Sequence, residues 1–146
     1  MIHRILLFVT LLFLPFRLAF GLNDPKAAAK DKQLRQLAVG TWQDDYQGKR
    51  TMTLKDDGTG KTVVELDGLR AKLFAERLEF DMVWSVENGR LKKRTLRGKP
   101  AVKVQLILKT MGDRVEEAIQ ELTEQRLLLL DGDGKTKYDW RRVEVK

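Results

Sequence analysis

The sequence predicts an all-β domain built as an antiparallel meander. Apolar side chains alternate with polar ones from Leu78 to Val86, which is the period of a strand with one buried face. Asn88-Gly89 follows directly, and this pair is the strongest two-residue signal for a β-hairpin. Further short alternating segments are separated by Gly and Asp turns at nearly regular spacing, which is typical of a β-sandwich or β-barrel.

The segment before Gly40 has a different pattern. Asp24 precedes Pro25, which fits an N-cap followed by proline at the first helical position. Good helix formers follow, and Leu34, Leu37 and Ala38 give one narrow apolar stripe. We therefore expect a short helix within residues 22–39, ending at Gly40, and a β domain over residues 40–146.

The strands after Gly40 are predicted from alternation and turns. Two short alternating segments flank the Asp56-Asp57-Gly58 turn, and another precedes Asp131-Gly132-Asp133-Gly134. Residues 102–108 alternate as well, through Val102, Val104, Leu106 and Leu108, and predict a strand. Tyr138 and Trp140 share one face of the last strand. In total we expect eight to ten strands.

Residues 113–125 allow two interpretations. Val115, Ala118, Ile119 and Leu122 are spaced like one face of a helix, and Asp113 and Glu116 resemble a capping box. The flanking pattern instead favours a strand at 115–121, a turn and a strand at 126–131. The strand gives an all-β domain, and the helix would give an α+β domain.

Residues 1–21 resemble a secretory signal peptide. A short positive start is followed by ten apolar residues from Ile5 to Leu14, and Ala19 and Gly21 supply small residues before a cleavage site. A retained membrane anchor is the alternative, but Arg17 interrupts the apolar run before the length of about 20 residues that a spanning helix needs. We expect an exported protein that is periplasmic, envelope-associated or secreted, and that begins near Leu22.

Composition argues against an enzyme. The chain has no Cys, and its one His is His3, within the proposed signal peptide. The mature chain therefore lacks the commonest general base, the thiolate nucleophile and the best transition-metal ligands. The Asp131–Gly134 turn suggests a calcium loop, but Lys135 and Arg142 would occupy ligand positions. No catalytic residue, metal or cofactor is predicted.

A basic segment spans residues 90–103. It contains no acidic residue, and the cations that we assign to a possible anionic partner are Arg90, Lys92, Lys93, Arg94 and Arg97. Such a segment can bind an anionic glycan, a lipid headgroup or an acidic protein surface, whereas nucleic acid is a poor candidate for an exported protein. The alternative is a solvated hairpin whose charges pair with Glu116, Glu117 and Glu121 across neighbouring strands.

Two short motifs give a family resemblance. Gly40-Thr41-Trp42, at the change from helix to strand, resembles the opening of lipocalin-like β-barrels, and Tyr138-Asp139-Trp140-Arg141-Arg142-Val143 resembles their last strand. The resemblance implies an Arg that covers the Trp ring at the closed end of the barrel, a favourable contact between guanidinium and indole. It assigns structural roles to five residues: Gly40, Trp42, Trp140, Arg141 and Arg142.

The resemblance also implies a function. An eight-stranded barrel either is filled by side chains or holds one small ligand. The leading expectation is a non-enzymatic binding module for a small apolar molecule, lined by Phe80, Met82, Trp84 and Leu106. The alternative is an envelope interaction protein that binds an anionic partner through residues 90–103.

Overall fold

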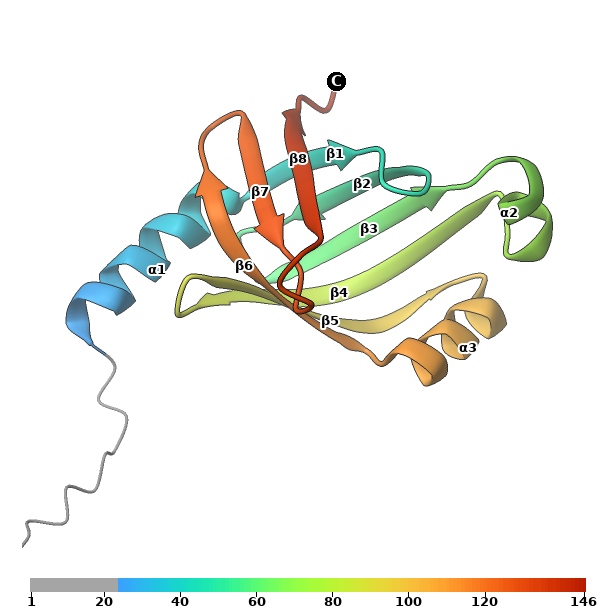
Figure 1. Cartoon of the computed structure of the whole chain (residues 1–146), viewed down its shortest axis with the longest axis horizontal. Helices are drawn as coiled ribbons and strands as arrows, with labels where there is room; N and C mark the ends of the chain where they lie inside the picture. Colours follow the sequence, from blue (N-terminus) through green and yellow to red (C-terminus); the bar gives the residue numbers. More distant parts are fainter. Residues whose placement is uncertain (1–23) are drawn as a thin grey trace, which may run out of the picture.

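The computed structural model describes residues 24–146, and the proposed signal peptide lies outside them. Eight antiparallel strands follow one another around a closed barrel, and β1 pairs with β8 to close it (Figure 1). Within residues 24–146, three helices accompany the barrel. The elements in order are α1 (Pro25–Ala38), β1 (Gly40–Asp44), β2 (Lys49–Leu54), β3 (Thr59–Glu65), α2 (Gly68–Leu73), β4 (Arg77–Glu87), β5 (Arg90–Lys99), α3 (Ala101–Met111), β6 (Arg114–Leu122), β7 (Arg126–Leu130) and β8 (Lys137–Val143).

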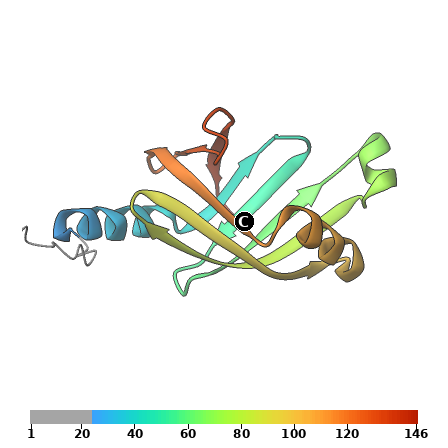
Figure 2. The same ribbon diagram turned by 60° about the horizontal axis from the view of Figure 1, so that its bottom comes forward.

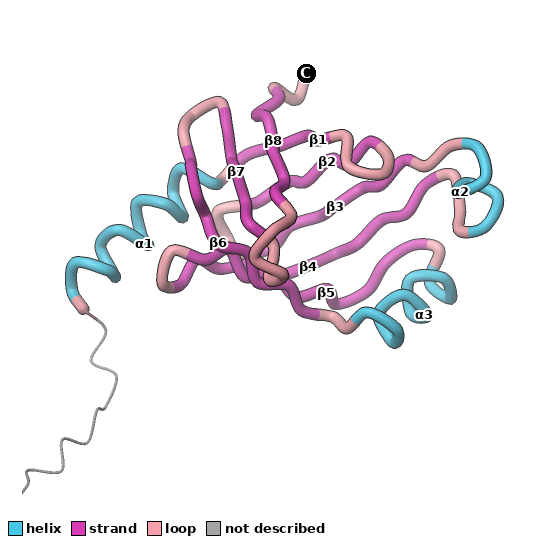
Figure 3. Tube along the Cα trace, in the orientation of Figure 1, coloured by secondary structure: helices cyan, strands magenta, loops and turns pink. Residues whose placement is uncertain are grey.

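The predicted all-β barrel with a short N-terminal helix is confirmed, as is the strand interpretation of residues 115–121. These residues belong to β6, so the α+β alternative is wrong. The prediction of a strand over residues 102–108 is also wrong, because they form α3. The short helix α2 was not predicted at all. Figure 3 shows both helices at the end of the barrel opposite α1.

The helix α1 is fixed to the barrel through its polar side chains. The Asp24 side chain accepts a hydrogen bond from Lys26 N, which caps the helix. The carboxylate of Asp31 accepts hydrogen bonds from the backbone N–H groups of Asn88 and Gly89, at 2.7 and 2.8 Å. Both of those residues have positive φ, as the predicted tight turn requires. The helix is therefore bonded to the β4–β5 hairpin.

The end of the barrel next to α1 is filled and closed. The Arg142 guanidinium lies 4.2 Å from the centre of the Trp42 ring and donates to the carbonyls of Leu37, Val39 and Glu124. Trp42 is fully buried, and its indole N–H donates to Ala38 O at 2.8 Å. A Cβ at Gly40 would clash with the Arg142 side chain, which explains the glycine there. The core that fills this end consists of Ala38, Trp42, Met52, Leu54, Met82, Trp84, Val86, Leu91, Leu127, Leu129 and Trp140.

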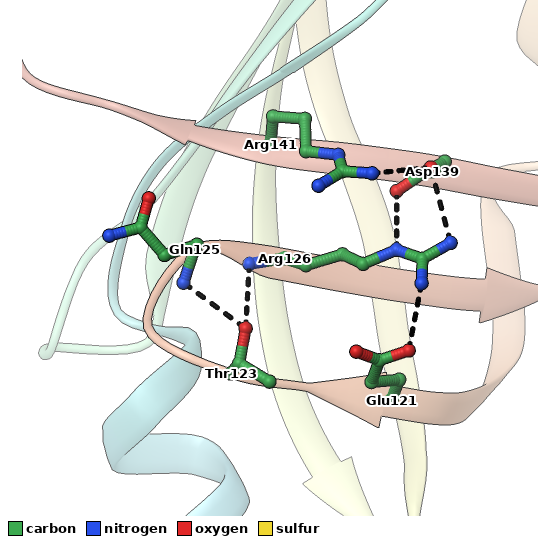
Figure 4. Close-up of polar contacts among 6 residues, drawn as sticks. All are labelled: Glu121, Thr123, Gln125, Arg126, Asp139 and Arg141. Carbon is green, nitrogen blue, oxygen red and sulfur yellow. Dashed lines mark hydrogen bonds and ion pairs between the residues drawn. The ribbon is translucent and has the colours of Figure 1, made fainter.

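The outer face of β6, β7 and β8 carries a network of ion pairs (Figure 4). Arg126 joins three strands, because its guanidinium contacts Glu121 at 2.9 Å on β6 and Asp139 at 2.9 Å on β8. Arg141 contacts Asp139 from the other side at 3.1 Å. These side chains are partly exposed, so each ion pair contributes little to stability.

No helix among the described residues has the length and apolar character needed to cross a membrane.

Candidate functional site

A cavity of about 560 Å³ lies at the end of the barrel away from α1. Its wall comes from inward side chains of the barrel and from α2 and α3, which are the connections β3–β4 and β5–β6. The apolar part of the wall consists of Val64, Leu66, Phe74, Leu78, Ile107, Met111 and Val115. The volume of the cavity falls in the range of about 300–1,000 Å³ that is usual for small-molecule sites.

The polar part of the cavity contains two ion pairs. Lys93 Nζ lies 2.5 Å from Glu117 Oε1, and these side chains are 15% and 4% exposed. The guanidinium of Arg50 binds both carboxylate oxygens of the buried Asp44, with Nε 2.7 Å from Oδ1. Each of these two cations on the barrel strands therefore has its own carboxylate, whereas Arg70 of α2, which also lines the cavity, has none within 4.0 Å among the described residues.

Aromatic rings surround the Arg50 guanidinium. It lies 5.1 Å from the ring centre of Tyr46, 4.9 Å from that of Tyr138 and 4.7 Å from that of Trp140. The Tyr46 and Tyr138 rings meet edge to face, with their centres 4.9 Å apart. The stacking and the bidentate pair fix the position of Arg50, because a planar guanidinium has preferred partners both in its plane and above it.

Tyr138 brings a neutral hydroxyl group to the cavity. Burial raises the pKa of Tyr138, and the nearby Asp131 raises it further, since both disfavour a phenolate. The hydroxyl therefore stays protonated throughout the physiological pH range and can donate or accept a hydrogen bond.

The residues that the sequence assigned to a ligand site lie elsewhere. Phe80, Met82 and Trp84 are on the inward face of β4, and Met82 and Trp84 are 4% and 5% exposed within the core. The Trp84 indole donates to Lys55 O and Thr59 O, and Arg35 of α1 lies over its ring. Leu106 lies on α3 and lines a smaller groove between α2 and α3. None of the four lines the cavity at the open end.

The assigned cations of the basic segment are paired among the described residues. The partners are Glu116 for Arg90 (3.7 Å), Glu87 for Lys92 (2.7 Å), Glu117 for Lys93 (2.5 Å), Asp113 for Arg94 (3.3 Å) and Asp81 for Arg97 (3.4 Å). Lys93 is inside the barrel, so it is not part of a surface patch. The basic segment is not one continuous strand, because β5 ends at Lys99 and Lys103 belongs to α3.

The Arg that the resemblance places over the Trp ring is Arg142, which covers Trp42. Arg141 is on the outer face of β8 and takes part in the network of Figure 4. Trp140 is 2% exposed and lies between the core and Arg50. Sequence reasoning did not assign Arg50, Tyr138 or Glu117 to a site, although Tyr138 was placed on the same strand face as Trp140.

Comparison with known proteins agrees with this architecture. A solved structure of a lipocalin-like protein from Bacteroides uniformis matches with a TM-score of 0.52 and 14% sequence identity, over 73% of this chain and 99% of that one. At this identity the match establishes the fold alone. No protein-family model and no curated protein matches the sequence. The chain is a small protein with a lipocalin-like, eight-stranded β-barrel fold.

Proposed function

We propose that this protein is an exported, non-enzymatic binding module that holds a small, mainly apolar molecule in the cavity at the open end of its barrel. The observation that carries the proposal is the cavity itself, which combines seven apolar side chains with a group of fixed polar ones. A concave, largely apolar site with a few polar groups is the usual form of a small-molecule site.

The polar groups favour a ligand without net charge. Lys93 and Arg50 are each matched by a carboxylate, so an anionic ligand would have to compete with Glu117 or Asp44 for its cation. The neutral hydroxyl of Tyr138 lines the same cavity and needs no such competition. An apolar molecule that carries one uncharged hydrogen-bonding group, such as an alcohol or an amide, therefore fits the part of the cavity that the barrel strands form.

An apolar fluorescent probe tests this proposal. Val115 points into the cavity from β6, and Val115→Trp should fill part of it and weaken probe binding by about tenfold or more, as the loss of about 1.4 kcal/mol would do. Val83, on the outer face of β4, is 37% exposed and does not line the cavity. Val83→Trp is therefore the matched control and should bind the probe like the wild type. No probe binding by the wild type, or equal loss in both variants, contradicts the proposal.

Export is the second part of the proposal and rests on residues 1–21. N-terminal sequencing of the protein from envelope or medium should find a chain that begins at or near Leu22. An intact Met1 chain in the membrane fraction would instead show a retained anchor. The alternative function, binding of an anionic partner through residues 90–103, is less favoured because acidic side chains already pair with the five cations assigned to it.

A further inference from the structure

The two helices beside the cavity expose an unusual amount of apolar surface. We call this surface the helical rim and define it as α2 with Phe74, together with α3. Leu69 is 70% exposed and Met111 is 80% exposed. Of the eleven large hydrophobic residues that are exposed in the described chain, six belong to the rim: Leu69, Leu73, Phe74, Val102, Leu106 and Met111. A cluster of this kind on a folded domain marks an interaction surface.

The helical rim is also purely cationic. Residues 68–74 and 101–111 contain Arg70, Lys72, Lys103 and Lys109 and no acidic residue. Among residues 24–146, none of these four side chains has a carboxylate within 4.0 Å. They differ in this respect from Arg90, Lys92, Lys93, Arg94 and Arg97, which are all paired. Apolar side chains among unpaired cations are the composition of a helix that lies on an anionic membrane surface.

The position of the rim relates it to the cavity. A groove of about 330 Å³ runs between α2 and α3 and shares Phe74, Ile107 and Met111 with the cavity wall. Figure 2 shows α2 and α3 together at one end of the molecule and α1 at the other. The surface that is most suited to lipid is therefore the surface around the mouth of the barrel.

We propose that the helical rim docks the protein on an anionic lipid bilayer, with the mouth of the barrel facing the membrane. The apolar side chains enter the interface, and the four cations lie at the level of the anionic headgroups. A second copy of the chain is a poorer occupant, because a symmetric contact would bring four unpaired cations against four others. The inference does not depend on whether the cavity holds a ligand.

Docking in this orientation has a consequence for the cavity. A molecule that partitions into the bilayer would meet the shared residues Phe74, Ile107 and Met111 before any other part of the interior. It could then pass between the bilayer and the barrel without crossing bulk water. The membrane is thus the expected source or destination of a cavity ligand.

Vesicle co-sedimentation tests the proposal with the chain from Leu22 onward, which contains the complete barrel and its core. The wild type should bind phosphatidylglycerol vesicles and should bind phosphatidylcholine vesicles at least tenfold more weakly. Binding should weaken steeply as added salt shortens the Debye length from about 30 Å to about 8 Å. A membrane-proximal Lys contributes about 1 kcal/mol, or roughly fivefold, so Lys72→Ala, Lys103→Ala and Lys109→Ala together should weaken binding by tenfold to about a hundredfold.

A matched control removes the same number of charges from the other end of the molecule. Lys26, Lys30 and Lys32 are exposed on α1, and their combined replacement by Ala gives the same net charge as the rim variant. This α1 control variant should bind phosphatidylglycerol vesicles nearly as well as the wild type. The variant Leu69→Ser, Leu106→Ser keeps the cations and should lose the salt-resistant part of the binding.

Three results would overturn the proposal. The first is that the wild type does not sediment with phosphatidylglycerol vesicles at low salt. The second is that the α1 control loses as much binding as the rim variant, which would show a response to net charge alone. The third is that the leucine variant binds like the wild type. None of these results bears on probe uptake by Val115→Trp, so failure of the docking proposal is distinguishable from failure of the proposed function.

Discussion

Replacement of Glu117 by Gln should destabilise the protein strongly, because it leaves a charged lysine inside the barrel. The Glu117 side chain is 4% exposed, and Lys93 opposite it is 15% exposed. Removing one partner of a buried ion pair usually costs about 3–5 kcal/mol, since the remaining charge is left uncompensated. Lys93 lines the cavity and can recruit some water there. We therefore expect a loss at the lower end, about 3 kcal/mol.

Urea unfolding measures this loss. The midpoint should fall with an unchanged slope m, because the amount of surface exposed on unfolding stays the same. Glu116→Gln is the matched control on the same strand. Glu116 is 54% exposed and its pairs with Arg90 and Lys92 are 3.7 and 3.8 Å long, so its loss should cost less than about 1 kcal/mol.

The double variant Lys93→Met, Glu117→Leu distinguishes the effect of an unpaired buried charge from the effect of altered packing. It removes both ions and replaces them by apolar groups, so it should be close to the wild type in stability or exceed it. It also remains informative if Glu117→Gln does not fold. A loss below about 1 kcal/mol in Glu117→Gln, or a double variant as unstable as the single one, would refute the assignment of a buried, energetically coupled pair.

Three further predictions concern the closed end and the mouth. Trp42→Ala should cost about 3–5 kcal/mol in a denaturant melt, as expected for a fully buried aromatic residue, and a cost below about 1 kcal/mol would contradict its place in the core. Arg142→Ala should cost at least about 3 kcal/mol, because it removes three hydrogen bonds to carbonyls and the contact with Trp42, whereas the exposed Arg141→Ala should cost less than about 1 kcal/mol. The chain has two tyrosines, so in Tyr46→Phe the phenolate absorbance reports Tyr138 alone. The midpoint of this absorbance change should lie at a higher pH than the ordinary tyrosine pKa of about 10. Because this pKa is raised in the folded state, the contribution of Tyr138 to stability is present below about pH 10 and is lost as the pH rises through the folded-state pKa; a midpoint at or below pH 10 would contradict the burial.

Much of the fold could be predicted because the barrel strands bury one face and expose the other. The alternation from Leu78 to Val86 and the Asn88-Gly89 turn give β4, the hairpin and the start of β5 directly. The same rule failed for residues 102–108. Val104 is the one buried residue of α3, and several of its other apolar residues face solvent. The alternation of apolar residues over 102–108 therefore does not indicate a buried face.

Local signals for α3 were nevertheless present. Pro100 precedes the helix and Gly112 follows it, with a positive φ and an N–H that donates to Leu108 O. These are the usual signals for the start and end of a helix. Gly98 adds a tertiary reason, because a Cβ there would lie 2.7 Å from Val104 Cγ1, so the helix packs closely on the end of β5.

The candidate site was much harder to predict. An alternating strand shows which residues point inward, but not how far along the barrel each one lies. Trp84 and Met82 point inward as expected, yet they fill the closed half. Arg50, Lys93 and Glu117 are charged residues at inward positions, and a pattern of hydrophobicity treats such residues as exposed. Their burial depends on partners from other strands, which only the register of the closed barrel brings together.

The separation of a filled end from a hollow end has a consequence for how this fold diversifies. None of the residues of the hydrophobic core cluster lines the mouth, so apart from the buried Lys93–Glu117 and Arg50–Asp44 pairs the folding of the chain and the shape of the mouth depend on different residues. Substitutions at Val64, Phe74 or Val115 can alter the shape of the cavity while the closed end keeps the protein above its stability threshold. Selection can therefore change what the barrel admits over many generations without the chain having to acquire a new core.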